Sequence, residues 1–226
     1  MSPENLIEKV ENYRDAKWRR EDDLKIEFVQ EAERMIEELG FCAALTDART
    51  KMPSLYIAVC GRRDAFAPRN VQKDVEMSLA WTLKDEILRR GKVFYAKLGK
   101  SRTLFVAPRL IGAFNCLFGV ERRIESRMLS KDALKILEVL NREFESASAD
   151  LRKETEISER SQFNKALDEL QQQLRVMPSD VIYQPKFTYI WTLTEARFPI
   201  EMKQKITREK AITEIARAYL GGAAQT

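Results

Sequence analysis

The chain contains no histidine, and its other reactive side chains stand apart from one another. Without histidine it has no histidine-based catalytic triad and no histidine metal site, and histidine cannot serve as its general acid or base. The three cysteines, Cys42, Cys60 and Cys116, each lie alone in an apolar stretch. Isolated thiols of this kind indicate small buried core residues in a reducing cytoplasm, and a nucleophilic cysteine is the less favoured interpretation.

The patterns that bind nucleotide phosphates are also missing. The fragment Gly99-Lys100-Ser101 matches only the end of a phosphate loop and is better interpreted as the turn of a hairpin. One acidic pair, Asp85-Glu86, precedes a basic stretch and supplies the only candidate catalytic carboxylates. Because Lys84, Arg89 and Arg90 surround this pair, we favour an exposed helix turn held in salt bridges. The sequence therefore predicts no cofactor and no metal, and it leaves enzymatic activity open.

Basic residues are concentrated in one part of the chain. Between Leu88 and Val120 there are seven Lys and Arg and no Asp or Glu, although the net charge of the whole chain is only +4. Aromatic residues, among them Tyr95 and Phe105, lie between these cations. Such a stretch suits double-stranded DNA, because cations displace counterions from phosphates and rings can stack on bases. The alternatives are that the stretch is only a solvated face, or that it binds a polyanion other than nucleic acid. The expected basic surface is wider than this stretch and runs from Arg62 to Arg109. Its candidate DNA contacts are Arg62, Arg63, Arg89, Arg90, Lys92, Lys97, Lys100 and Arg102.

Apolar spacing predicts mostly helices in the first half of the chain. We expect helices over the first forty residues, ending at Gly40, and over 75–90, ending at Gly91. Ser54 and Gly61 fit the two ends of a short helix, and a buried strand is the alternative for the residues between them.

A hairpin and one more helix follow. Two short apolar runs, 93–98 and 103–106, flank the glycine-containing turn and predict a β-hairpin. Pro108 then opens a helix that Gly119 ends. The charged residues 120–129 read as a link between two halves.

Three helices are predicted next. Ser130 fits the N-cap of the first, Ser148 the N-cap of a short second one, and the third begins near Ser161. After them, 174–177 is predicted as a short strand, with Pro178-Ser179-Asp180 as a turn.

The last part of the chain completes this pattern. Residues 187–193 alternate in the manner of a strand, and Pro199 opens a single tail helix that ends at Gly221-Gly222. Three helices followed by a hairpin predict a winged helix-turn-helix, in which the third helix enters the major groove of DNA.

The third helix could read DNA bases. Its apolar stripe turns Asn, Gln, Lys and Arg outward, and these side chains read base edges. Asp168 lies in the middle of the same face, where it would repel phosphate, so a module for packing or protein contacts is the alternative. The candidate DNA contacts in this half are Asn164, Lys165, Gln172, Arg175 and Lys186.

Several segments in serial order carry a resemblance to a known family. They are Gly40-Phe41-Cys42, Pro53 to Arg63, Trp81 to Glu86, Phe94 to Leu98, Phe105 to Leu110, Ala113-Phe114, Phe163 to Gln171 and Phe198-Pro199. In these segments the chain resembles the AlkZ-like (YcaQ-like) winged-helix DNA glycosylases, and among them the short relatives.

The resemblance implies helix-turn-helix and winged-helix units that cradle duplex DNA. The family's full-length members cut the N-glycosidic bond of alkylated or crosslinked purines and use a Gln-x-Gln motif on a β-hairpin. The only Gln-x-Gln here, Gln171 and Gln173, lies inside a predicted helix, so no catalytic residue is carried over. A non-enzymatic winged-helix transcription regulator or protein-interaction module is the alternative function.

Together these patterns predict a mostly α-helical α+β protein with a winged helix and small β-hairpins. The expected parts are N-terminal helices at 1–40, a basic helix-turn-helix-like region at 41–125, a winged helix at 126–197 and a tail helix at 198–226. No apolar run is long enough to cross a membrane, and the acidic start does not resemble a signal peptide, so we expect a cytoplasmic protein.

Overall fold

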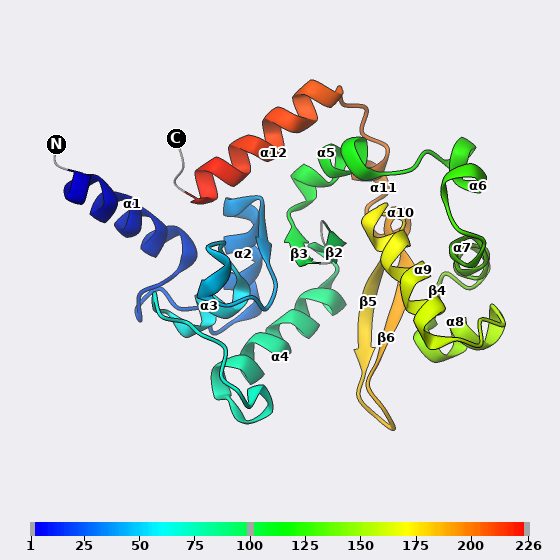
Figure 1. Ribbon diagram of the computed structural model, residues 1–226, viewed down its shortest axis with the longest axis horizontal. Helices are drawn as coiled ribbons and strands as arrows, with labels where there is room; N and C mark the ends of the chain where they lie inside the picture. Colours follow the sequence, from blue (N-terminus) through cyan, green and yellow to red (C-terminus); the bar gives the residue numbers. More distant parts are fainter. Residues whose placement is uncertain (1–2, 99–101, 224–226) are drawn as a thin grey trace.

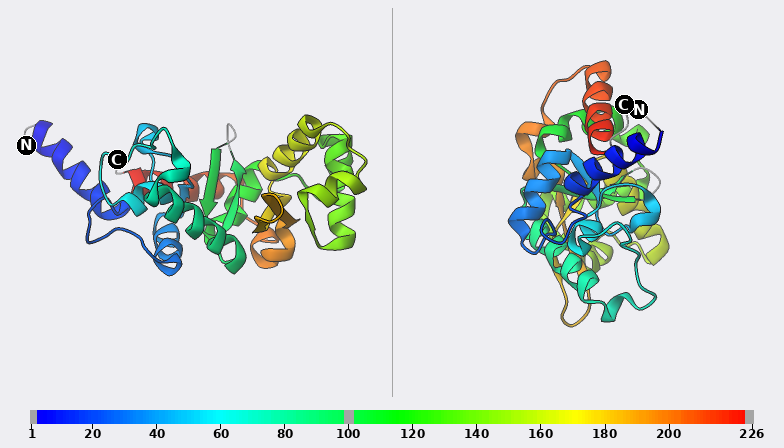
Figure 2. Two further views of the ribbon diagram at one scale, coloured as in Figure 1. Left: turned by 90° about the horizontal axis from the view of Figure 1, so that it is seen from below. Right: turned by 90° about the vertical axis from the view of Figure 1, so that its left-hand side faces the viewer.

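The structure is a computed structural model that describes residues 3–98 and 102–223. The expected turn at 99–101, and with it the candidate contact Lys100, lies outside the described residues. The fold is α+β and mostly helical, with two small antiparallel sheets (Figure 1). Figure 2 shows an elongated molecule in which α1 projects from one end.

The first half follows the predicted order of helices and strands. Its elements are α1 (Pro3–Trp18), α2 (Val29–Leu39), β1 (Phe41–Ala43), η1 (Ala48–Thr50), α3 (Leu55–Cys60), η2 (Val71–Lys73), α4 (Val75–Arg90), β2 (Phe94–Leu98), β3 (Arg102–Val106) and α5 (Pro108–Phe118). The expected hairpin is present as β2 and β3, and β1 pairs with the free side of β3 to give the order β1-β3-β2.

The short segment between Ser54 and Gly61 is helical, and the strand alternative is wrong. The Ser54 hydroxyl accepts a hydrogen bond from the Ile57 amide at 3.1 Å and donates one to the Thr46 carbonyl at 2.6 Å. Gly61 ends the helix with a φ of 60°, a left-handed conformation that glycine adopts without a steric penalty.

Replacing Ser54 by alanine is expected to lower the free energy of unfolding by about 1–2 kcal/mol, because a buried cap and its second hydrogen bond are both removed. Urea unfolding measures the change. The matched control is Ser78→Ala on the exposed face of α4, for which we expect a change within about 0.5 kcal/mol. Equal effects of the two substitutions would contradict the assigned role of Ser54.

The second half contains a second three-stranded sheet. Its elements are η3 (Arg122–Ile124), α6 (Glu125–Met128), α7 (Lys131–Glu143), β4 (Glu145–Ala147), α8 (Ser148–Glu154), α9 (Arg160–Gln172), β5 (Val176–Ile182), β6 (Thr188–Leu193), α10 (Thr194–Arg197), α11 (Pro199–Met202) and α12 (Arg208–Ala223). The strand order is β4-β6-β5, so β6 is central and β5 is an edge strand.

The predicted turn at Pro178-Ser179-Asp180 is wrong, because these residues lie inside β5. The pairing of β5 with β6 shifts between Pro178 and Asp180, so the segment forms a β-bulge. A proline is tolerated there, since an edge strand with a bulge can do without its missing N–H donor. The turn of the β5–β6 hairpin comes later, between Ile182 and Thr188.

Two smaller expectations also differ from the structure. The N-cap of α8 is Ala147, and Ser148 is the first helical residue, whose hydroxyl accepts a hydrogen bond from the Trp191 indole at 2.8 Å. The tail is two helices, α11 and α12, because the chain leaves the helical conformation between Met202 and Arg208.

Three hydrophobic clusters hold these parts together. One lies among the helices of the first half, and a second lies among α7, α8, α9 and β6. The third joins the halves, because Phe94 and Leu110 pack with Leu174, Met177 and Phe198. None of the helices among the described residues is long and apolar enough to span a membrane.

Candidate nucleic-acid interface

A groove of about 660 Å³ opens where the two halves of the chain meet. The β2–β3 hairpin lies on one side of it, and α8, α9 and the β5–β6 hairpin lie on the other. Figure 1 shows α9 and the long β5–β6 hairpin side by side next to the β2–β3 sheet. Its volume lies within the range of small-molecule and cofactor sites, about 300–1,000 Å³.

Aromatic side chains form one wall of the groove. Along the β5–β6 hairpin the rings of Tyr183, Phe187, Tyr189 and Trp191 follow one another, with successive centroids 5.5, 5.1 and 5.7 Å apart, and the last three of them line the groove. Each neighbouring pair meets edge to face, which is a favoured arrangement of aromatic rings. Across the groove, Tyr95 is buried, and this burial, together with the neighbouring Tyr189 hydroxyl, raises the pKa of Tyr95 well above its usual value. The groove therefore offers flat rings and a neutral phenol hydroxyl.

A fixed carboxylate lies on the α9 side of the groove. Asp168 Oδ1 accepts hydrogen bonds from Lys97 Nζ at 2.8 Å and from Gln171 Nε2 at 3.3 Å. Gln171 is itself buried, and its Oε1 accepts a hydrogen bond from the Lys97 backbone amide at 3.0 Å. Strand β2 and helix α9 are thus linked by polar contacts through the same three residues.

Three exposed cations line the groove, and we call them the groove cations: Arg152, Arg160 and Lys186. Among the described residues none of the three forms an ion pair. Asn164 also lines the groove, and Lys165 is exposed next to it on α9. Cations without a carboxylate partner are available to neutralise phosphates.

Most of the other predicted DNA contacts are already paired with acids. Arg62 pairs with Glu76, Arg63 with Asp15, Arg89 with Asp180 at 2.7 Å, Arg90 with Glu33 at 2.6 Å, and Lys92 lies 4.0 Å from Glu33. Arg102 and Gln172 are exposed and lie outside the groove.

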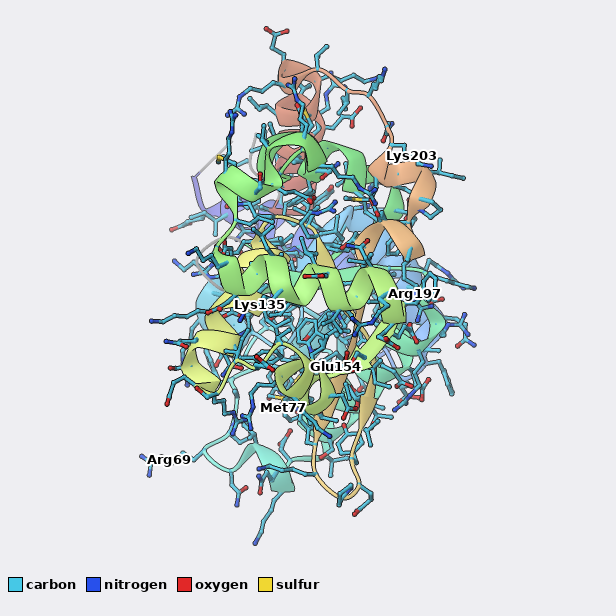
Figure 3. The ribbon with its side chains drawn as sticks, turned by 90° about the vertical axis from the view of Figure 1, so that its right-hand side faces the viewer. Arg69, Met77, Lys135, Glu154, Arg197 and Lys203 are labelled. Carbon is cyan, nitrogen blue, oxygen red and sulfur yellow. The ribbon has the colours of Figure 1, made fainter. Side chains whose placement is uncertain are left out.

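The basic residues expected between Arg62 and Arg109 do not form one surface. Arg62 pairs with Glu76 in the first turn of α4, and Arg89 and Arg90 lie in its last turn, about 20 Å farther along the helix. Arg69, on the loop before α4, stands at the outer edge of the view in Figure 3. The structure therefore brings Lys97, Asn164 and Lys186 together at the groove and leaves the cations that follow α3, and those on α4, elsewhere.

The expectation that Arg175 faces outward is wrong. Helix α9 ends at Gln172, and Leu174 adopts a φ of 53° that turns the chain back into the molecule. Arg175 is only 6% exposed and pairs with Glu125 at 2.6 Å. Arg175 therefore forms a structural ion pair and is not available to contact DNA.

The acidic pair Asp85-Glu86 is also not the exposed turn that the sequence indicates. Lys84 and Asp85 are buried and pair with each other, and the Tyr183 hydroxyl donates a hydrogen bond to Asp85. Partial burial of the Tyr183 hydroxyl and its bond to Asp85 raise the pKa of Tyr183 to about 12. Because its carboxylate is enclosed and occupied, Asp85 cannot reach a substrate.

Two groove residues lie outside the stretch that the sequence singles out. Arg152 and Arg160 lie on the short helix α8 and at the start of α9, away from the region that is rich in basic residues. They could still have been recognised in the sequence by their place in the predicted winged helix. Arg160 stands at the start of the helix predicted to read DNA, and Arg152 lies in the helix before it.

Comparisons with known proteins agree with this fold. The AlkZ-related family model matches residues 26–220, which is most of the chain. Among solved structures, the Streptomyces sahachiroi DNA glycosylase AlkZ matches with a TM-score of 0.55 at 11% sequence identity. The match covers 93% of this chain and 57% of that one, so the chain spans little more than half the length of the enzyme. No curated protein matches the chain.

Because the family model covers most of the chain, from α2 through most of α12 and including both sides of the groove, the chain belongs to the AlkZ-related family.

Proposed function

We propose that the protein binds double-stranded DNA across the groove, as a DNA-repair protein related to the glycosylases that remove alkylated or crosslinked bases. The observation that carries this proposal is the set of groove cations, Arg152, Arg160 and Lys186, beside a wall of aromatic rings. Phosphates at the rim would neutralise the cations, and the rings would stack on a base turned out of the duplex. Membership of the AlkZ-related family and the likeness to a DNA glycosylase support the same class of partner.

The second half of the chain supplies the proposed DNA-binding unit. From α7 to β6 the elements follow the order helix, strand, helix, helix, strand, strand, which is the order of a winged helix-turn-helix. In such a unit α9 would enter the major groove and the β5–β6 turn would lie along the backbone. Asn164 and Lys165 lie on the first two turns of α9, and Lys186 lies in the hairpin turn, so all three fit these positions.

A salt titration of binding to a short labelled duplex tests the proposal. Each neutralised phosphate releases counterions, so the logarithm of the association constant should fall with the logarithm of salt concentration with a slope of about −0.9 per phosphate. Three groove cations predict a slope of about −2.7 or steeper. The matched control is the same duplex competed with unlabelled DNA of unrelated sequence, since phosphate contacts carry no sequence information.

Binding at low salt that weakens with this slope would support the proposal. An absence of binding at low salt would contradict the proposal and would favour the protein-interaction module, with α9 as a packing surface.

A further inference from the structure

We propose that two loops of the first half, one before α3 and one before α4, form a second contact with duplex DNA outside the groove. The loops are residues 46–52 and 64–73, and both lie within the described part of the chain. The inference rests on the proposed DNA binding and extends the bound duplex beyond the groove.

Three exposed cations on these loops carry the inference, and we call them the loop cations: Lys51, Arg69 and Lys73. Among the described residues none of the three forms an ion pair. Arg62 and Arg63, just before the second loop, differ in this respect, because each is paired with an acid. The loop cations are therefore available to neutralise phosphates.

Polar contacts tie the two loops into one surface. Asp47 accepts hydrogen bonds from the Arg49 amide in its own loop at 3.0 Å and from the Ala67 amide in the other loop at 3.2 Å. The Arg49 guanidinium pairs with the same carboxylate at 3.0 Å and stands over the Phe66 ring, 5.5 Å from its centroid. A surface that is fixed in this way in the free protein loses little conformational entropy when it binds.

Most carboxylates near the loop cations are engaged within the protein. Asp47 is only 9% exposed, and Asp74 caps α4 by accepting a hydrogen bond from the Met77 amide at 2.7 Å. Asp64 is the one exposed acid in the two loops. The exposed side of the loops thus carries more positive than negative charge, which suits a phosphate backbone.

Helix α4 connects the loop cations with the groove. Tyr183, in the turn of the β5–β6 hairpin, donates a hydrogen bond to Asp85, whereas the second loop runs into Val75 at the start of α4. From Val75 to Asp85 the helix rises by about 15 Å, which equals about four to five base pairs of duplex. Figure 1 shows the loop before α4 and the β5–β6 turn at the same lower edge of the molecule. A duplex that leaves the groove past Lys186 along this edge would meet the loop cations about half a helical turn later.

This part of α4 presents no free carboxylate to such a duplex. Its exposed side chains between Val75 and Asp85 are uncharged: Val75, Ser78, Trp81 and Thr82. Glu76 is paired with Arg62, and Asp85 is buried. DNA can therefore pass from the groove to the loops without meeting an unpaired negative charge.

The repeated order of elements in the two halves is a separate reason. From α2 to β3, apart from the short η1 and η2, the order is helix, strand, helix, helix, strand, strand, and the sheet order β1-β3-β2 matches β4-β6-β5. The loop between α3 and α4 therefore corresponds to the turn between α8 and α9. Arg152 and Arg160 flank that turn at the groove, so Arg69 and Lys73 lie in the equivalent part of the first half.

The test measures binding to a labelled duplex of about 24 base pairs by fluorescence anisotropy over a series of salt concentrations. The loop variant is Lys51→Gln, Arg69→Gln and Lys73→Gln, which keeps polar side chains and removes the three charges. We expect its affinity to fall by about tenfold or more at low salt, because the contacts of the loop cations with phosphates are lost. With groove and loops both engaged, the salt slope should be about −5.4 for the unmodified chain and about −2.7 for the loop variant.

The matched control is Lys203→Gln, Lys205→Gln and Arg208→Gln, which removes the same charge from exposed positions away from both surfaces. Figure 3 shows Lys203 and Arg69 at opposite edges of the molecule. The affinity of the control should stay within about threefold of the unmodified chain, from the general field alone. A conservative variant, Lys51→Arg, Arg69→Lys and Lys73→Arg, keeps the charges and should bind as the unmodified chain does. Thermal melting checks that every variant is folded.

A DNA stem-loop of about six base pairs separates the two surfaces. At about 20 Å its stem is too short to fill the groove and reach the loops together, so the loop variant and the unmodified chain should bind it within about twofold of each other. Equal affinities and slopes of the loop variant and the control on the long duplex would overturn the inference, while binding at the groove would stand. An equal loss on the stem-loop and on the long duplex would also overturn it, because the loops would then not extend the groove. If the unmodified chain does not bind the long duplex, the proposed function fails and the inference fails with it.

Discussion

Reversing the charge of the three groove cations together is expected to weaken binding to duplex DNA by about a hundredfold or more at low salt. The variant is Arg152→Glu, Arg160→Glu and Lys186→Glu. Each substitution removes a cation without an acidic partner and places a carboxylate where the proposal puts a phosphate. The salt dependence should also become shallower, by about 0.9 in slope for each phosphate that is no longer neutralised. Fluorescence anisotropy over a series of salt concentrations measures both quantities.

A control of equal net charge separates a local effect at the groove from a general electrostatic one. Lys203, Lys205 and Arg208 are exposed and lie on the connection from α11 to α12 and at the start of α12. Figure 3 shows Lys203 near the edge of the molecule opposite the β5–β6 turn. Changing these three to glutamate alters the net charge by the same amount, and we expect affinity to fall by less than about tenfold, from the general field alone. Equal losses in the two triple variants would remove the groove as the binding surface.

The sequence predicts the local elements of this fold well, because their signals are local. Gly40, Gly61 and Gly91 each end a helix with a positive φ, as their positions after apolar helical runs indicate. The predicted turn at Pro178-Ser179-Asp180 is wrong because a distant contact overrides the local signal. Proline, serine and aspartate favour turns in isolation, but pairing with β6 keeps them in a bulged strand.

The site is less predictable, since it depends on contacts between distant parts of the chain. The bond from Lys97 to Asp168 joins residues 71 positions apart, and the bond from Tyr183 to Asp85 joins residues 98 positions apart. In the sequence, Asp168 reads as a carboxylate that would repel phosphate, because nothing nearby shows that Lys97 will hold it. A count of basic residues likewise cannot show which of them are neutralised in the folded protein.

The buried pair of Lys84 and Asp85 also depends on contacts with a distant part of the chain. Breaking this pair is expected to have the largest effect on stability. Lys84 is fully buried, with its ammonium 4.6 Å from the Trp81 ring centroid and 3.4 Å from the Tyr189 hydroxyl. Asp85 supplies the only carboxylate that pairs with it among the described residues, and it also accepts the hydrogen bond from Tyr183. The pair thus lies where α4 meets the β5–β6 hairpin, and it couples the first half of the chain to the aromatic wall of the groove.

Replacing Asp85 by alanine is expected to lower the free energy of unfolding by about 3–5 kcal/mol, because it leaves a buried ammonium without a counter-charge. Urea unfolding followed by circular dichroism measures this change. The surface comparison is Asp22→Ala, which removes the exposed partner of Lys25 and should cost less than about 1 kcal/mol.

The double variant Lys84→Met and Asp85→Ala distinguishes an uncompensated charge from impaired packing. With both charges removed, we expect it to regain most of the stability that Asp85→Ala loses, because apolar replacement of a buried ion pair is often neutral. Its affinity for DNA then reports on the hairpin. If Tyr183 needs Asp85 to hold the aromatic wall in place, the double variant will be stable and yet bind DNA more weakly than the unmodified chain. A double variant no more stable than Asp85→Ala would show that packing around Asp85, and not the charge of Lys84, sets the cost.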